Sequence, residues 1–149
     1  MFHFGYGSNL NIDFVREYLI PDVKFVMKGY LPNFEVRFPF WSEEKQGGYS
    51  GIMETPGEMV QGALYEVSAE DLEAVDELDV YKGLYYRQTY LVLGEDGDWR
   101  PADLYRVIDP QGPFPPVRSY VETMLEGARN LDLDPEYIEK IEEFHRQGQ

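Results

Sequence analysis

Residues 4–10 read Phe-Gly-Tyr-Gly-Ser-Asn-Leu and combine two glycines with two small polar side chains. They follow a short apolar run and precede a helix-like pattern from Asn11, so they predict a turn between a strand and a helix. Glycine lets a backbone approach a bound group closely, and N–H groups ahead of a helix suit a carboxylate or oxyanion. The segment equally fits a simple turn in which Ser8 or Asn9 caps the helix. Because Leu10 stands where a third glycine is required, a dinucleotide fingerprint is excluded.

The composition narrows the class of protein. A chain of 149 residues, 43% of them hydrophobic, fits a single domain with a buried core, which we expect to span residues 1–149. The formal charge of −15 argues against nucleic acid or an anionic membrane as partner, although a small anionic ligand needs only local donors. Cysteine is absent, and His3 and His145 stand at opposite ends, so we expect no metal site. Without an apolar run of spanning length or a signal peptide, we expect a cytoplasmic protein.

Both helices and strands are expected to position this loop. Residues 11–19 predict a helix that Pro21 stops, with apolar side chains on one face. Residues 23–40 predict a strand with a break near its middle. Two more strands, 51–53 and 60–67, are expected around a Pro-Gly turn.

The second half begins with a helix whose N-cap is Ser68 and whose expected end is near Gly83. A hairpin and two helices follow, at 84–93, 99–108, 120–128 and from 134 onward. No repeat or linker divides the chain. The order of the elements predicts an α+β fold built on a largely antiparallel sheet or barrel.

The segment Tyr6-Gly7-Ser8-Asn9-Leu10, which follows a short predicted strand, resembles the opening motif of the γ-glutamylcyclotransferase (AIG2-like) family. Later segments resemble the same family in the right order, at 56–65, 78–87 and 116–138, and together they cover nearly the whole chain. The resemblance implies a small, mostly antiparallel β-barrel or curled sheet with flanking helices. It implies neither a cofactor nor a metal.

The family's reaction is an intramolecular acyl transfer. The α-amine of a γ-glutamyl group attacks its own side-chain carbonyl, and 5-oxoproline and a free amine are released. This needs a folded substrate, donors that face the oxyanion, and a general base. The resemblance implies a small-molecule partner, a γ-glutamyl amine or related anionic ligand, and no oligomeric state. It assigns the binding of the head group to Tyr6, Gly7, Ser8, Asn9, Leu10 and Tyr86.

The general acid/base is where the chain departs from the family. The family's pattern is Leu-Asp-x-x-Glu-Gly, with that Glu as the acid/base, whereas residues 78–83 read Leu-Asp-Val-Tyr-Lys-Gly. Lys82 therefore stands at the catalytic position. If Lys82 transfers the proton, its pKa must fall far below about 10.4, yet the acids around it raise that pKa.

Other interpretations stay open. A different carboxylate, from Asp79, Glu54 or Glu58, could take over the proton transfer. Alternatively the chain keeps the pocket without the reaction, as a binding or regulatory domain, with Lys82 favouring a ligand that carries an extra anionic group. Lys82 also fits a helix C-terminus, where a cation in solvent meets the negative end of the dipole. A protein-interaction scaffold is a further option, and it predicts no pocket near Gly7.

Overall fold

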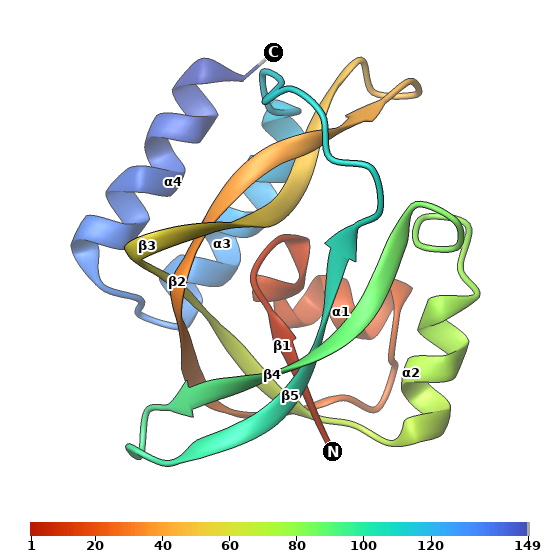
Figure 1. Cartoon of the computed structure of the whole chain (residues 1–149), viewed down its shortest axis with the longest axis vertical. Helices are drawn as coiled ribbons and strands as arrows, with labels where there is room; N and C mark the ends of the chain where they lie inside the picture. Colours follow the sequence, from red (N-terminus) through yellow and green to blue (C-terminus); the bar gives the residue numbers. More distant parts are fainter. Residues whose placement is uncertain (149) are drawn as a thin grey trace.

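A five-stranded barrel closes around the core of the computed structural model, which describes residues 1–148 (Figure 1). The order of the strands is β1-β3-β2-β4-β5. Neighbouring strands pair antiparallel, except that β1 closes the barrel on β5 in parallel, where His3 is the partner of Asp103. The expected mostly antiparallel barrel with flanking helices is confirmed. The strands are β1 (Phe2–Gly5), β2 (Lys24–Ser42), β3 (Gly47–Glu66), β4 (Tyr85–Gly94) and β5 (Trp99–Val107).

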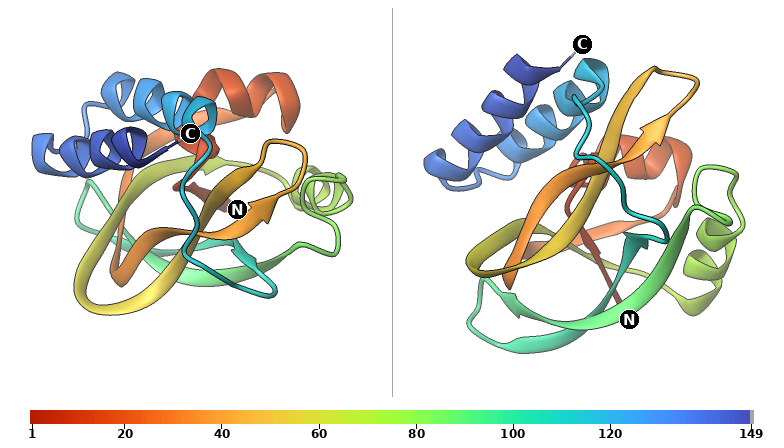
Figure 2. Two further views of the ribbon diagram at one scale, coloured as in Figure 1. Left: turned by 90° about the horizontal axis from the view of Figure 1, so that it is seen from above. Right: turned by 45° about the horizontal axis from the view of Figure 1, so that its top comes forward.

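The helices flank the barrel on different sides. In Figure 2, α3 and α4 lie side by side, away from α2. No helix among residues 1–148 is long and apolar enough to cross a membrane. The helices are the short 3-10 turn η1 (Ser8–Leu10), α1 (Ile12–Tyr18), α2 (Ala69–Asp76), α3 (Arg118–Asn130) and α4 (Pro135–Gln147).

Two groups of buried side chains hold these elements together. One fills the barrel and its contact with α3, and it includes Phe4, Leu64 and Met124. The other joins α1 and α2 to the outside of the barrel through residues such as Val15 and Leu72. The first group includes Tyr6 and Leu10, so burial of apolar surface fixes the position of the loop at 6–10.

The two long strands differ from the prediction. Neither the expected break within 23–40 nor the expected turn at 55–58 interrupts its strand. The register instead shifts between Pro32 and Phe34, where Asn33 has a positive φ of 68° and its side chain accepts a hydrogen bond from the N–H of Gly57. A β-bulge therefore absorbs the proline that the sequence pattern marks as a breaker.

Helix α2 begins as predicted and ends early. Ser68 caps it in a reciprocal capping box with Asp71. Its last residue is Asp76, several residues before the expected end, and the chain then reverses through turns that deliver it to β4. Gly83, with a φ of 77°, supplies the left-handed conformation that this reversal needs. Asn11 caps α1, so the alternative cap by Ser8 or Asn9 is wrong.

Candidate functional site

A cavity of about 450 Å³ opens beside the loop at 6–9, a volume typical of small-molecule sites. Its walls come from that loop, the C-terminal end of α1, the turn at 78–81, two residues each of β1 and β3, and single residues of β4, β5 and α3. The scaffold interpretation predicted no pocket near Gly7 and is therefore wrong. The lining residues used below are His3, Tyr6, Gly7, Ser8, Asn9, Phe14, Tyr18, Leu19, Ser50, Leu78, Asp79, Val80, Tyr81, Tyr85 and Tyr120.

Gly7 lets two hydroxyl groups come close to the loop. The Oη of Tyr120 accepts a hydrogen bond from the N–H of Ser8 at 3.3 Å and lies 2.7 Å from the Oγ of Ser50. A Cβ at position 7 would lie 2.7 Å from that Tyr120 Oη, inside van der Waals contact. The glycine is therefore required for close approach rather than for an unusual dihedral angle.

A buried hydrogen-bond chain orients Asn9. The Nδ1 of His3 lies 3.0 Å from the carbonyl oxygen of Asp103, so Nδ1 carries the proton and Nε2 accepts from the Nδ2 of Asn9 at 2.8 Å. This turns the Oδ1 of Asn9 toward the Oη of Tyr81 and the Oγ of Ser8, each at 3.4 Å. Burial lowers the pKa of His3 to about 4, so the ring is neutral at pH 7 and the orientation is stable.

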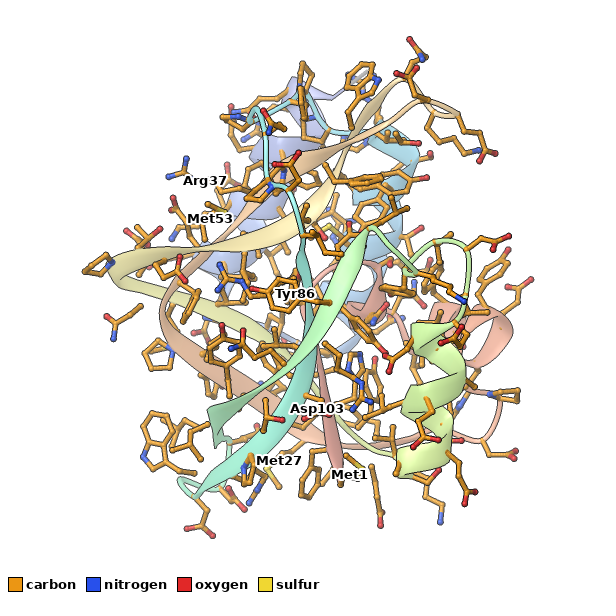
Figure 3. All side chains as sticks on the ribbon, turned by 45° about the vertical axis from the view of Figure 1, so that its right-hand side comes forward. Met1, Met27, Arg37, Met53, Tyr86 and Asp103 are labelled. Atoms are coloured by element: carbon orange, nitrogen blue, oxygen red, sulfur yellow. The ribbon has the colours of Figure 1, made fainter. Side chains whose placement is uncertain are left out.

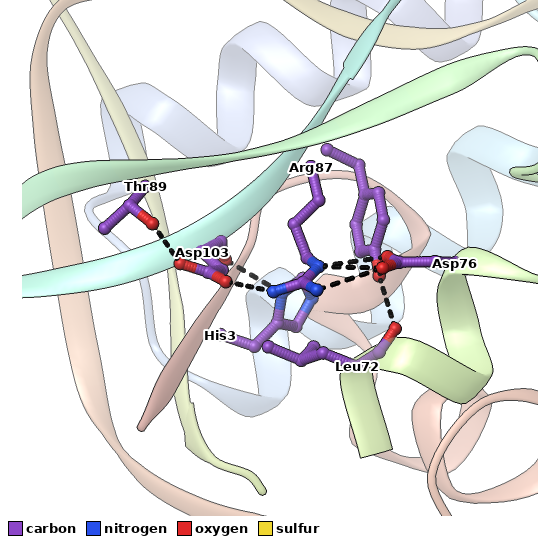
Figure 4. A network of polar contacts seen from close by, with 7 residues as sticks. His3, Leu72, Asp76, Arg87, Thr89 and Asp103 are labelled. Carbon is purple, nitrogen blue, oxygen red and sulfur yellow. Dashed lines mark hydrogen bonds and ion pairs between the residues drawn. The ribbon is translucent and has the colours of Figure 1, made fainter. Parts of the chain in front are cut away.

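An ion-pair network lies behind His3 (Figure 4). The guanidinium of Arg87 on β4 donates to both carboxylate oxygens of Asp76, at 3.0 and 3.1 Å, and at 2.5 Å to Asp103 on β5. Thr89 donates to the other oxygen of Asp103, and Tyr105 donates to Asp76. The network ties the end of α2 to β4 and to β5, whose Asp103 carbonyl accepts the hydrogen bond from His3.

Phenol groups form much of the polar surface of the cavity. Tyr6 donates to the carbonyl of Tyr105 at 2.5 Å, and Tyr85 donates to the carbonyl of Ser50 at 3.0 Å. Burial raises the pKa of Tyr6, Tyr81 and Tyr85 well above the usual value for tyrosine. At neutral pH these groups are hydrogen-bond donors and not bases.

The family model described as γ-glutamyl cyclotransferase, AIG2-like, matches residues 3–122 of this chain. The chain belongs to this family. A protein of Bos taurus named γ-glutamylcyclotransferase is 26% identical over 144 residues, which cover 93% of this chain and 76% of that relative. A solved structure named γ-glutamyl cyclotransferase superposes with a TM-score of 0.87 at 26% identity, over 95% of this chain and 86% of that one. YkqA from Bacillus subtilis, at 21% identity, supports the fold alone, with a TM-score of 0.81 over 98% of this chain and 54% of its own.

Lys82, which the sequence pattern predicted to stand at the family's acid/base position, lies outside the cavity. Its side chain is 65% exposed, and its Nζ forms an ion pair with the Oε2 of Glu77 at 2.7 Å, which raises the pKa of Lys82. The prediction of a pocket lysine is therefore wrong. Because α2 ends at Asp76, residue 82 follows a turn and not a helix. Of the neighbours Tyr81 and Lys82, Tyr81 lines the cavity.

Two further predicted residues also lie away from the cavity. Tyr86, labelled in Figure 3, is 41% exposed, whereas its neighbour Tyr85 lines the cavity. Successive strand residues point to opposite faces, so an offset of one residue decides this. Leu10 is 1% exposed and packs in the barrel core. Tyr6, Gly7, Ser8 and Asn9 all line the cavity, and their binding of the head group stays a prediction.

Of the three carboxylates considered as replacement bases, one lines the cavity. Glu54 pairs with Arg106 at 2.8 Å, which lowers the pKa of Glu54, and Glu58 pairs with Lys140. Asp79 is the only acidic residue in the cavity wall formed by residues 1–148, and that wall contains no Lys or Arg. Within the same described range, no three His, Asp or Glu residues gather as a metal site.

Sequence reasoning missed several residues of the wall, namely Ser50, Tyr81, Tyr85 and Tyr120. Ser50 and Tyr120 carried no local signal, because each reaches the loop only through the closure of the barrel. For Tyr85 the sequence contained a partial signal. In a strand, Tyr85 and Arg87 lie on one face and Tyr86 on the other, and the contact of Arg87 with Asp103 identifies the face of Tyr85 as the inner one.

Proposed function

We propose that this protein binds the γ-glutamyl group of a γ-glutamyl amine or amide in the cavity beside residues 6–9. Family membership and the relatives named γ-glutamylcyclotransferase support this substrate class. The observation that carries the proposal is that the family's head-group loop, Tyr6 to Asn9, is one wall of the cavity.

The polar groups of the inner wall suit a glutamyl head group. The hydroxyls of Ser50 and Tyr120 lie 2.7 Å apart beside the N–H of Ser8, and these groups are able to donate to its α-carboxylate. The Oδ1 of Asn9 is an acceptor oriented toward the same space and suits the α-ammonium. The head group is thus held by neutral dipoles, without a cationic side chain.

Cyclisation is the second function, and we assign its proton transfer to Asp79. Asp79 removes a proton from the α-ammonium, and the free amine attacks the γ-carbonyl carbon. The amide C–N bond then breaks while the attacking nitrogen loses a second proton, and the two protons pass one after the other through Asp79 to the departing nitrogen, so that 5-oxoproline and an ammonium ion leave without water being consumed. Asp79 is favoured because the phenols stay protonated and Lys82 faces solvent.

Binding and turnover are tested separately. Calorimetry should detect binding of γ-L-glutamyl ethylamide and none of its α-glutamyl isomer, which presents the amide on the wrong carbon. Release of 5-oxoproline by the wild type should be abolished by Asp79→Asn, while the affinity changes little. If the wild type binds without turnover, the protein is a binding domain; if it distinguishes neither isomer, the binding proposal fails.

A further inference from the structure

The cavity has two chemically different ends. The inner end is lined by buried polar residues, among them His3, Ser8 and Asn9, each less than 8% exposed. Toward solvent, the wall consists of apolar and aromatic side chains from two separate segments. These are Phe14, Tyr18 and Leu19 of α1 and its C-terminal end, and Leu78 and Val80 of the turn after α2.

The outer end exposes apolar surface that is not covered by the rest of the chain. Tyr18 is 61% exposed and Val80 is 57% exposed, although both line the cavity. The rings of Phe14 and Tyr18 are tilted against each other with centroids 5.1 Å apart, which presents a continuous aromatic surface. A flat or branched apolar group seated there would remove this surface from water.

Charge makes the same end unsuitable for an anion. Asp79 lies between Leu78 and Val80 in the wall, and no Lys or Arg of the described residues lines the cavity. Lys82, in the turn that follows Leu78 and Val80, is paired with Glu77 in solvent. A carboxylate on the outer half of a ligand would therefore meet a like charge without a partner, in a protein whose formal net charge is −15.

We propose that the amine half of the ligand is a neutral, apolar amine of aromatic or branched alkyl type, bound between α1 and the turn at 78–80. This inference rests on the proposed function, because the γ-glutamyl half must occupy the inner end. It assigns selectivity against γ-glutamyl amino acids and peptides, whose outer half carries a carboxylate. It also replaces the expectation, based on Lys82, of a ligand with an extra anionic group.

The test uses ligands that differ by one group. γ-L-glutamyl-2-phenylethylamide and γ-L-glutamyl-L-phenylalanine share the head group and the ring, and only the second has a carboxylate beside the amide. We expect the phenylethylamide to bind the full-length wild type at least tenfold more tightly by calorimetry. γ-L-glutamyl ethylamide, which lacks the ring, should bind with intermediate affinity.

Three variants locate the selectivity. Tyr18→Ser should weaken binding of the phenylethylamide at least fivefold and leave the ethylamide unchanged. Leu91→Ser is the matched control, because Leu91 is also 61% exposed but lies outside the cavity wall. Val80→Lys adds a cation to the rim and should tighten binding of the phenylalanine compound selectively.

The outcomes separate the two proposals. If none of the γ-glutamyl compounds binds, the proposed function fails. If the phenylalanine compound binds as tightly as the phenylethylamide or more tightly, this inference is overturned and the proposed function stands. The inference is overturned equally if Tyr18→Ser behaves like Leu91→Ser toward the phenylethylamide.

Discussion

Tyr81 and Lys82 are consecutive residues whose side chains lie on opposite sides of one turn. The Oη of Tyr81 is 3.4 Å from the Oδ1 of Asn9 in the cavity wall, and the ring of Tyr81 packs against Tyr105 with centroids 4.4 Å apart. The Nζ of Lys82 lies in solvent beside Glu77. The reversal between α2 and β4 thus directs Tyr81 toward the cavity and Lys82 away from it.

Substituting Lys82→Glu should therefore create no cyclotransferase activity. A carboxylate at this position would face solvent and be repelled by Glu77, so the 5-oxoproline release of the variant should stay within twofold of the wild type. The affinity for γ-L-glutamyl ethylamide should also be unchanged. Lys82→Gln serves as the control for loss of the ion pair, and a large gain of turnover specific to the Glu variant would contradict the solvent-facing turn.

His3 should make the protein less stable in mild acid. Its folded pKa of about 4 lies below the ordinary value of 6.5, so the unfolded chain binds the proton more tightly and stability falls as the pH drops. The contribution is fully present above pH 6.5 and decreases by about 2 kcal/mol between pH 7.5 and 5. Urea unfolding at both pH values measures it.

The control for this pH effect is His3→Gln, which keeps a polar side chain but cannot titrate. The variant should be less stable at pH 7.5, because the chain from Asp103 to Asn9 is disturbed. Its loss of stability toward pH 5 should be smaller than that of the wild type. Parallel decreases in the two proteins would show that other groups dominate the acid response.

A methyl group at position 7 should distort the loop at 6–9. The Cβ of Gly7→Ala would crowd the hydroxyls of Ser50 and Tyr120, at an expected cost of about 1 to 3 kcal/mol in the free energy of unfolding. The affinity for γ-L-glutamyl ethylamide should fall at least tenfold. The double variant with Tyr120→Phe removes one of the crowded hydroxyls and should recover part of the stability; no recovery would point to a different cause.

Removing Arg87, the cation of the ion-pair network behind His3, should destabilise the barrel. Arg87→Met leaves the nearly buried carboxylate of Asp103 without its charged partner, and we expect a loss of about 2 to 3 kcal/mol by chemical unfolding. Adding Asp103→Asn should restore part of this loss, since Thr89 keeps an oxygen acceptor there. Arg146→Met, which breaks exposed pairs on α4, is the matched control and should have little effect.

Local patterns were sufficient for several elements of this protein. The capping box at Ser68, the Asp134-Pro135 start of α4 and the hairpin of β4 and β5 follow from interactions between residues close in sequence. The loop at 6–9 lines the cavity, and the close approach to a bound group that its composition indicates stays a prediction. Resemblance to the family supplied the barrel and the substrate class.

Tertiary structure alone decided which side chains enter the cavity. The end of α2 depends on Asp76 meeting Arg87 and Tyr105, residues that local periodicity does not connect to it. That end sets the turn, and the turn assigns Tyr81 to the cavity and Lys82 to solvent. Likewise the register of β4 selects Tyr85 over Tyr86. Composition and spacing determine which helices and strands form. Closure of the barrel determines which of their side chains point into the cavity, because that closure depends on contacts between residues distant in sequence.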